Sequence, residues 1–316
     1  MILDLEVTLA KIMKMKILIT GATGLIGKEL TNLILSKNHT VHYLTTSKTK
    51  IKDSHNCKGF YWNLKQNSID ENCLQGVDVI VHLAGANIAK RWTKEYKAEI
   101  LESRILSSQL LYNLVKTKPN AIKQLICASG TAIYPESYTK VYDESTTEID
   151  EGFLSNVVKQ WEESVDVFEE LGIKVCKLRT GIVFSKTGGA LPQIAKPIQM
   201  GFGAALGNGN QIQTWIHLKD LVALYFFAIE NALSGVFNAV SPEPVSNKDL
   251  TKIIASTLGK PLFLPNIPKF ILRFMLGEMS SILFSSKLLS AQKIIDNGFD
   301  FKFPKVQQAI TDIYSE

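Results

Sequence analysis

Short apolar runs recur along the first half of the chain, at residues 16–20, 41–44, 77–83, 124–128 and 174–178. The runs at 79–81 and 125–127 contain no alternating polar residues, so they predict strands that are buried on both faces. An amphipathic segment follows the first run, and its apolar stripe consists of Leu25, Ile26, Leu30, Leu33 and Ile34. Strands followed by helices in this order predict right-handed crossovers and an α/β fold with a doubly wound parallel sheet.

The alternation of strands and helices is lost at about 188–214 and again from 242 onward, where Pro and Gly become more frequent. No long polar linker separates these stretches, so we expect interleaved domains. We predict a larger domain from 14–187 and 215–241, and a smaller C-terminal, substrate-side domain from 188–214 and 242–316. Residues 1–13 are expected to be an N-terminal extension, and their Asp4 and Glu6, without a basic leader, do not fit a signal peptide.

Glycines three positions apart mark the turn between the first strand and its helix, in Gly21-Ala22-Thr23-Gly24-Leu25-Ile26-Gly27. Gly21 permits a tight turn, Gly24 lets the backbone approach a pyrophosphate, and Gly27 lets the helix pack closely on the strand. The helix N-terminus presents free N–H groups and a positive dipole to phosphate. The pattern therefore predicts a Rossmann-type dinucleotide site, with contacts from Gly21, Thr23, Gly24, Leu25, Ile26 and Gly27.

Composition and charge narrow the functional classes. The 316 residues are 46% hydrophobic and 21% charged, with a net charge of +5 from lysines that are scattered among acidic residues. This balance is typical of a globular domain and gives no support for nucleic-acid binding. The four cysteines lack metal-ligand spacing, so we expect no metal, reduced thiols and a cytoplasmic protein. The apolar stretch 270–284 is too short and too charged to span a bilayer, so we expect no membrane contact and interpret it as a core or dimer-facing helix, with a homodimer possible.

Further motifs carry a family resemblance. The Thr-Gly-x-x-Gly-x-x-Gly spacing resembles extended short-chain dehydrogenases/reductases, and so do Leu83-Ala84-Gly85, Leu178-Arg179-Thr180-Gly181 and Trp215-Ile216-His217-Leu218-Lys219-Asp220. The combination with His82, Ser103-Arg104, Trp161-Glu162, Gly207-Asn208-Gly209 and Leu276-Gly277-Glu278-Met279 is similar to the atypical epimerase-family branch, whose members often carry the label SulA-like cell-division inhibitor. The resemblance runs from about Lys14 to the C-terminus. It implies further cofactor contacts at Leu83, Ala84, Gly85, Glu99, Arg104 and Val183, although Glu99 fits a surface ion pair equally well.

The end of the second strand bears on the choice of cofactor. An NAD site usually has Asp or Glu there, whose carboxylate binds the ribose 2′-hydroxyl and would repel a 2′-phosphate. This chain has Thr45-Thr46-Ser47-Lys48 instead, and hydroxyls with a nearby lysine suit a phosphate. We therefore expect NADP(H) to be favoured over NAD(H), with contacts from Thr45, Thr46 and Lys48. The family often has Arg where this chain has Thr46, and Arg would bind a phosphate more strongly.

The catalytic positions depart from the superfamily. Extended members use a Ser, a Tyr and a Lys four residues after the Tyr, with the Lys lowering the phenol pKa. Alignment on Tyr134 and on Trp161-Glu162 places Gly130, Leu154 and Val158 at those three positions. The remaining candidates are Ser129, Thr131 and Tyr134, with Tyr138 and Tyr142 in the next loop. For Tyr134 we prefer a structural role, and the same holds for His217.

Two functions follow from these expectations. The first is an NADP(H)-dependent oxidoreductase or nucleotide-sugar epimerase acting on a small-molecule substrate, which rests on the family resemblance. The second is a non-catalytic protein that senses NADP(H) or a metabolite, in line with the cell-division label. The missing Ser, Tyr and Lys count against the first, and the sequence shows no partner surface for the second.

Overall fold

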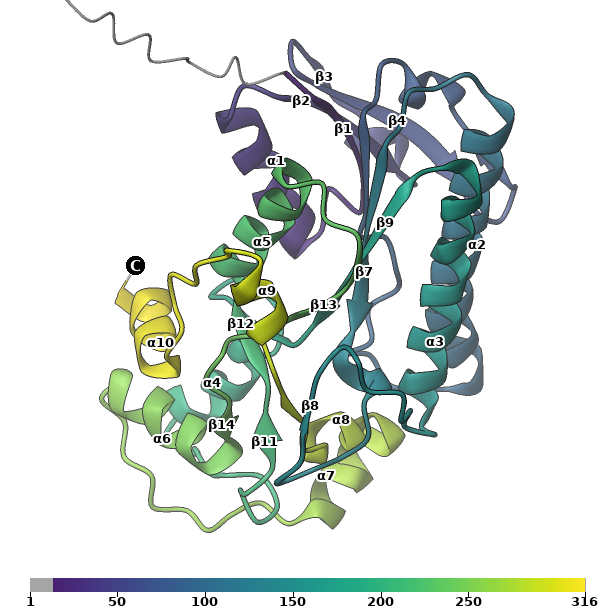
Figure 1. Cartoon of the computed structure of the whole chain (residues 1–316). Helices are drawn as coiled ribbons and strands as arrows, with labels where there is room; N and C mark the ends of the chain where they lie inside the picture. Colours follow the sequence, from purple (N-terminus) through teal and green to yellow (C-terminus); the bar gives the residue numbers. More distant parts are fainter. Residues whose placement is uncertain (1–13, 316) are drawn as a thin grey trace, which may run out of the picture.

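A computed structural model describes residues 14–315. Within them, a nine-stranded sheet has the order β13-β9-β7-β6-β1-β2-β4-β3, with β5 paired to β4 (Figure 1). The strands from β13 to β4 are parallel, and only β3 and β5 run antiparallel to β4. The sheet consists of β1 Lys16–Thr20, β2 Thr40–Thr45, β3 Asp53–Ser54, β4 Cys57–Asn63, β5 Ser68–Ile69, β6 Val79–His82, β7 Gln124–Gly130, β9 Lys174–Thr180 and β13 Gly235–Ala239.

The five strands predicted from apolar runs form the centre of this sheet, and the predicted fold class is confirmed. The return to the sheet expected within 218–240 is made by β13. The sequence interpretation missed β4, which pairs in parallel with β2. Its residues 57–63 include Lys58, which is exposed, Gly59, and Asn63, which is partly exposed, so they lack the continuous apolar run that marked the central strands.

Helices cover both faces of the sheet (Figure 1). Helices α1 and α5 pack together on one face, and α2 and α3 pack together on the other. Alternate residues of β1 explain this, because Ile17 and Ile19 join the core under α1 and α5 while Leu18 joins the core under α2 and α3. The helices are α1 Leu25–Ser36, α2 Lys94–Thr117, α3 Phe153–Asp166, α4 Leu191–Gln199, α5 Leu218–Glu230, α6 Asn247–Thr257, α7 Lys269–Leu276, α8 Ser281–Phe284, α9 Gln292–Asp296 and α10 Val306–Ser315.

A third apolar core lies away from the main sheet. It joins side chains of α4, α6 and α10 with Phe184 and Trp215, whose rings stack at 5.2 Å. The segment after residue 242 divides between two cores, because Ala291, Ile294, Phe299 and Phe301 pack in the core of α1 and α5 instead. The short strand pairs in this part are β10 Ile182–Phe184 with β12 Trp215–His217, β11 Ile212–Gln213 with β14 Val245–Ser246, and β15 Leu288–Leu289 with β8 Val141–Tyr142.

Of the two interpretations of 270–284, the core helix is wrong, and the dimer-facing helix stays a prediction. The stretch forms α7 and α8 separated by a 3-10 turn, and α7 has no buried residue. Phe274 is 89% exposed and Phe270 is 72% exposed. Apolar periodicity alone could not distinguish this helix from a core helix, because both have an apolar face. No helix within 14–315 is long and apolar enough to cross a membrane.

Candidate functional site

The glycine turn has the geometry that its spacing predicts. Gly21 has a φ of +72°, in the left-handed region that favours glycine. A methyl group at Gly27 would lie 2.3 Å from the carbonyl oxygen of Gly21, which no real side chain tolerates. The Gly24 N–H donates to that same carbonyl at 2.9 Å and closes the turn. Gly21 and Gly27 therefore fix the shape of the turn.

Gly24 has a different role from its two neighbours. It is the N-cap of α1 in extended backbone, and no side chain caps the helix there. A methyl group at Gly24 would meet only the Gly21 carbonyl, at 3.2 Å, so the space beyond it is open to a ligand. The first-turn N–H groups thus lack a side-chain cap at a positive helix end, which is the arrangement that binds phosphate. The turn fits a dinucleotide pyrophosphate.

A buried hydrogen-bond network joins the turn to the end of β6. The Thr20 hydroxyl accepts from the backbone N–H groups of Leu83 and Ala84 at 3.0 Å, so its own proton goes to His82 Nδ1 at 2.7 Å. The hydroxyls of Ser107 and Ser108 both donate to the Arg104 carbonyl, which leaves them to accept from His82 Nε2. His82 is thus neutral and protonated on Nε2. Burial, helped by the charge of Arg104, lowers the pKa of His82 to about 3.

Arg104 is a largely buried cation beside this network. Its guanidinium donates to the carbonyls of Ala86 and Ile100 and lies 4.8 Å from the centre of the Trp161 ring. A methyl group at Gly85 would lie 3.0 Å from the guanidinium carbon, so a larger residue there would press on the Arg104 side chain. Burial lowers the pKa of Arg104 to about 10. The guanidinium is therefore costly to bury at the carboxyl end of β6, where an anionic ligand would stabilise it.

Two other predicted cofactor residues, Val183 and Glu99, have different surroundings. Val183 is the middle residue of β10. Its carbonyl lies near Gly189, and both Gly188 and Gly189 approach the Leu25 side chain at the start of α1. Glu99 is exposed on α2, and none of the described contacts joins it to the turn. The structure therefore places Val183 and Leu25 beside the same pair of glycines and leaves Glu99 on the surface.

The end of β2 presents hydroxyls and a lysine to solvent. Thr45 is buried and its hydroxyl accepts from the Ser47 N–H at 3.2 Å, whereas Thr46 and Lys48 are exposed. Lys48 Nζ lies 5.2 Å from the centre of the Tyr61 ring. No acidic residue occurs between Leu44 and Asp53, so nothing in this loop opposes a 2′-phosphate.

A second buried network occupies the carboxyl ends of β7 and β9. Ser129 donates to Glu162 at 2.5 Å, and Arg179 makes a bidentate pair with the same carboxylate at 2.9 and 2.8 Å. Arg179 also donates to the Tyr134 hydroxyl at 2.9 Å, and that hydroxyl donates to Asn238 Oδ1 at 2.8 Å. Burial alone would raise the pKa of Glu162, but the hydrogen bonds and charge of Arg179 outweigh it and the pKa is lowered.

The Tyr134 hydroxyl both accepts and donates a hydrogen bond within this network. Burial raises the pKa of its phenol, although the Arg179 charge and hydrogen bond act in the opposite direction. Lys287 donates to the Tyr134 backbone carbonyl and lies 3.9 Å from Asp150. The Tyr134 side chain is only 1% exposed. Its single proton already goes to Asn238, so it is poorly placed to exchange a proton with a substrate.

The positions aligned with the catalytic Ser and Lys touch one another. A methyl group at Gly130 would lie 3.2 Å from a Val158 methyl, and Val158 is buried while Lys159 next to it is exposed. Of the other candidates, Thr131 is half-buried in the turn after β7, Tyr138 is exposed, and Tyr142 stacks on Tyr134 at 6.2 Å. The surroundings of Gly130 are therefore apolar on the α3 side.

Sequence reasoning missed two members of the second network, Asn238 and Glu144. The Glu144 carboxylate accepts from the Asn238 N–H at 2.6 Å and joins a loop to the edge strand β13. A signal was present for Glu162, because it falls on the apolar face of α3 beside Trp161 and Val165. No comparable signal marks Glu144, which lies in an irregular loop.

His217 is the N-cap of α5. Its Nδ1 accepts from the Lys219 N–H at 3.0 Å, and its Nε2 lies 3.3 Å from Asp312. The ring also packs on Phe303 with centroids 4.1 Å apart. These contacts join α5 to the C-terminal segment and give the ring a structural role.

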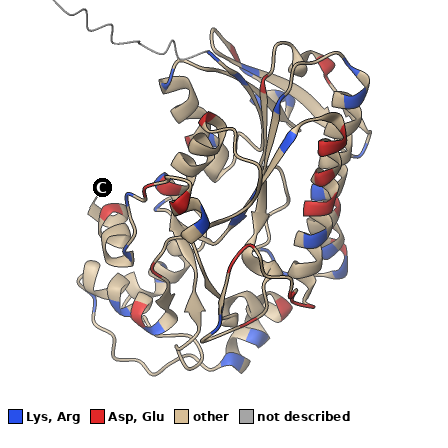
Figure 2. Cartoon of the chain, in the orientation of Figure 1, with Lys and Arg blue, Asp and Glu red and all other residues tan. Residues whose placement is uncertain are grey.

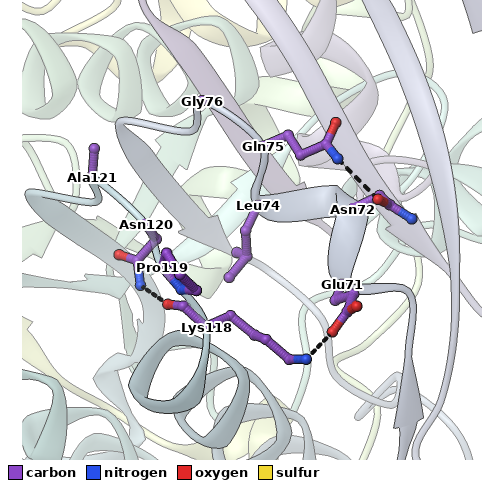
Figure 3. Close-up of a pocket in the computed structure, with 9 residues that line it drawn as sticks. All are labelled: Glu71, Asn72, Leu74, Gln75, Gly76, Lys118, Pro119, Asn120 and Ala121. Carbon is purple, nitrogen blue, oxygen red and sulfur yellow. Dashed lines mark hydrogen bonds and ion pairs between the residues drawn. The ribbon is translucent and has the colours of Figure 1, made fainter.

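A surface hollow lies on the opposite side from the carboxyl ends, at the amino ends of β6 and β7 (Figure 3). It is formed where the chain enters β6 and β7, and an ion pair between Glu71 and Lys118 crosses it (Figure 3). Ligands of doubly wound sheets bind at the carboxyl ends of the strands. This hollow is therefore not part of the candidate site.

Comparison with known proteins places this geometry in a family. Residues 17–239 match the NAD dependent epimerase/dehydratase family, and residues 267–313 match a domain of unknown function, DUF1731. An epimerase family protein of Staphylococcus aureus (strain MRSA252), SAR0825, is 37% identical over 307 residues, covering 95% of this chain and 99% of that protein. The chain belongs to the NAD dependent epimerase/dehydratase family.

Two further relatives refine the assignment. The chloroplastic epimerase family protein SDR39U1 homolog of Arabidopsis thaliana is 33% identical over 304 residues, covering 95% of this chain and 87% of that protein. The crystal structure of human epimerase family protein SDR39U1 (isoform 2) with NADPH has a TM-score of 0.83 and 28% identity, covering 96% of this chain and 100% of that chain. The predicted epimerase-family branch of the extended short-chain dehydrogenases/reductases is confirmed.

Proposed function

We propose that this member of the family binds NADP(H) and is an epimerase/dehydratase-like oxidoreductase that lacks the usual Ser, Tyr and Lys. The observation that carries the proposal is the pairing of Tyr134 with Arg179 and Asn238 beside the contact of Gly130 with Val158. Support for NADP(H) comes from the open turn at Gly24, the loop after β2 without acidic residues, and the NADPH in the human SDR39U1 structure. The substrate would be a small molecule.

The cofactor supplies hydride transfer at its nicotinamide when bound. The chain contributes backbone N–H groups of the turn for the pyrophosphate and exposed Thr46 and Lys48 for the 2′-phosphate. Near Gly130 it contributes an apolar wall and no tyrosine–lysine pair of the usual spacing. General acid–base assistance is worth about 100-fold to 10,000-fold, so turnover of ordinary sugar nucleotides or carbonyl compounds should be very weak or absent.

A second candidate function is regulatory sensing of NADP(H) or a metabolite. It is favoured by the same observation, because Ser129 and Tyr134 are both engaged in bonds within the protein. Such a protein would bind the cofactor with full affinity and show no turnover. The two functions therefore differ in chemistry and agree in binding.

The binding half of the proposal is tested at Gly24. The substitution Gly24→Val fits the extended backbone of an N-cap, but its side chain enters the space of the pyrophosphate. We expect NADPH binding, followed by fluorescence titration, to be lost while circular dichroism and the unfolding midpoint stay close to wild type. Equal NADPH affinity in the two proteins would refute the site.

The chemical half is tested at Tyr134. If oxidation of NADPH by candidate carbonyl substrates is detectable at all, Tyr134→Phe should leave its kcat unchanged, because the hydroxyl serves Arg179 and Asn238. The variant should bind NADPH normally, which separates this test from the one at Gly24. A loss of turnover of 100-fold or more would show that Tyr134 is the proton donor and that the site is intact by another route.

A further inference from the structure

Most of the large apolar side chains that are exposed within 14–315 fall in two stretches. The first is the end of α4 and the following turn, and the second is the connection from α6 together with α7. The two stretches touch, because Ile267 N–H donates to the Ala205 carbonyl at 2.8 Å and the Leu262 side chain packs on Gly203. We call this the apolar end, defined by Met200, Phe202, Leu262, Phe263, Leu264, Phe270, Ile271, Phe274 and Met275.

The apolar end has protruding side chains. Phe263, Phe270 and Phe274 are 70%, 72% and 89% exposed. On α7, Phe270 and Phe274 are four residues apart, as are Ile271 and Met275, so all four lie on one face. Figure 1 places α7 and the connection before it at one extremity of the molecule. An exposed apolar surface of this kind marks an interaction site.

Basic side chains border this surface without acidic neighbours in the sequence. Lys252 pairs with Asp249 at 3.6 Å, but from there to Glu278 the chain has Lys260, Lys269 and Arg273 and no Asp or Glu. Lys269 and Arg273 form their own stripe beside the apolar face of α7, and Figure 2 shows blue and no red on this helix. Lys269 Nζ lies 5.2 Å from the centre of the Phe284 ring. Phenylalanines flanked by Lys and Arg on a short helix are typical of segments that lie in a membrane interface.

We propose that the apolar end docks on an anionic lipid surface. This departs from our expectation of no membrane contact and a possible homodimer. A two-fold symmetric dimer through α7 would bring Lys269 and Arg273 close to their own copies, with no acidic residue between Asp249 and Glu278 to offset them. Protein interfaces are depleted in Lys at their centres, whereas anionic lipid attracts such residues. The apolar end does not include the turn at Gly24, which lies at the start of α1.

The test uses the full chain and flotation with vesicles of phosphatidylcholine, with or without phosphatidylglycerol. We expect the protein to float with the vesicles that contain phosphatidylglycerol, and to be released by high salt because the contact is partly electrostatic. The double variant Phe270→Asp with Phe274→Asp should lose flotation. Lys269→Glu with Arg273→Glu should weaken binding at least about 30-fold, because about 1 kcal/mol of attraction is lost for each basic side chain and the new carboxylates are repelled.

Controls separate docking from misfolding. Ile149→Asp changes an apolar side chain that is 46% exposed elsewhere, and it should float like wild type. The α7 variants should keep wild-type NADPH affinity, so failure here is distinguishable from failure of the proposed function. Wild type that does not float overturns the proposal, as does flotation that survives the double Phe variant. Light scattering that shows a dimer converted to a monomer by the Phe variants, without flotation of wild type, would assign the surface to a second copy.

Discussion

The carboxyl ends of β1 and β7 lie in the same sheet but use their polar groups in opposite ways. At the end of β1, backbone N–H groups of α1 lack a capping side chain and face open space at Gly24. At the end of β7, the hydroxyls of Ser129 and Tyr134 are bonded to Glu162, Arg179 and Asn238. The first end is prepared for a ligand, and the second is closed within the protein.

This difference indicates that the groups for cofactor binding and the groups for proton transfer lie on separate elements of this fold. Binding depends on backbone geometry, which Gly21 and Gly27 fix while Gly24 leaves space for the ligand. Proton transfer depends on a few side chains with tuned pKa values, and we propose that Gly130, Leu154 and Val158 occupy their positions in this chain. The hydroxyls of Ser129 and Tyr134 beside them are hydrogen-bonded within the protein.

The largest effect that sharpens this comparison is expected for Glu162→Gln. The substitution leaves the buried Arg179 guanidinium without its charged partner, and breaking such a pair costs about 3–5 kcal/mol. We expect urea unfolding to show a free energy of unfolding lower by this amount, while the folded protein keeps wild-type NADPH affinity. The exposed neighbour Glu163 provides the matched control, since Glu163→Gln should change stability by less than about 0.5 kcal/mol. A stable Glu162→Gln variant with impaired NADPH binding would mean that the two strand ends are coupled.

A smaller effect is expected from His82, which joins β6 to the turn. Its pKa is about 3 in the folded protein and about 6.5 in an unfolded chain. Because the ring takes up a proton only on unfolding, its contribution to the free energy of unfolding is fully present above about pH 6.5. This contribution falls as the pH decreases toward 3. Between pH 7 and pH 5 the loss from this group is about 2 kcal/mol.

Two measurements check the His82 prediction. Urea unfolding at pH 7 and pH 5 measures the loss in the free energy of unfolding. His39 and His42 contribute to this loss in the same direction, because burial lowers their pKa values too. The NMR signal of the His82 ring, assigned with a His82→Asn variant, should not titrate down to pH 5. A ring that titrates near pH 6.5 would disprove the neutral, Nε2-protonated assignment.

The sequence predicted the backbone of this protein better than its side-chain networks. Continuous apolar runs and glycine spacing identified the five central strands and the turn at Gly21, because both depend on local residue order. The Tyr134 hydroxyl donates to Asn238, which is distant in sequence, so no local pattern could reveal the bond. The exposure of α7 was also missed, because an apolar helix face looks the same in the sequence whether protein, lipid or water covers it.

The smallest expected effect concerns the choice between NADPH and NADH, and it tests the open end of the comparison. Thr46 and Lys48 are exposed at the end of β2, and an exposed ion pair contributes only about 0.2–1 kcal/mol. We therefore expect NADPH to bind about two- to fivefold more tightly than NADH by this contact. The preference should decrease as salt is added, since the contact is screened.

Single variants within this loop distinguish a direct contact with the 2′-phosphate from the general effect of positive charge. Lys48→Ala should remove most of the preference, whereas Lys50→Ala should leave it unchanged, because we interpret Lys50 as part of a solvated surface. Thr46→Arg should increase the preference about fivefold by adding a planar donor for the phosphate. Fluorescence titrations with both cofactors at low and high salt measure each case. Tighter binding of NADH by wild type would show that the end of β2 recognises the ribose hydroxyls, and the missing carboxylate would then need another explanation.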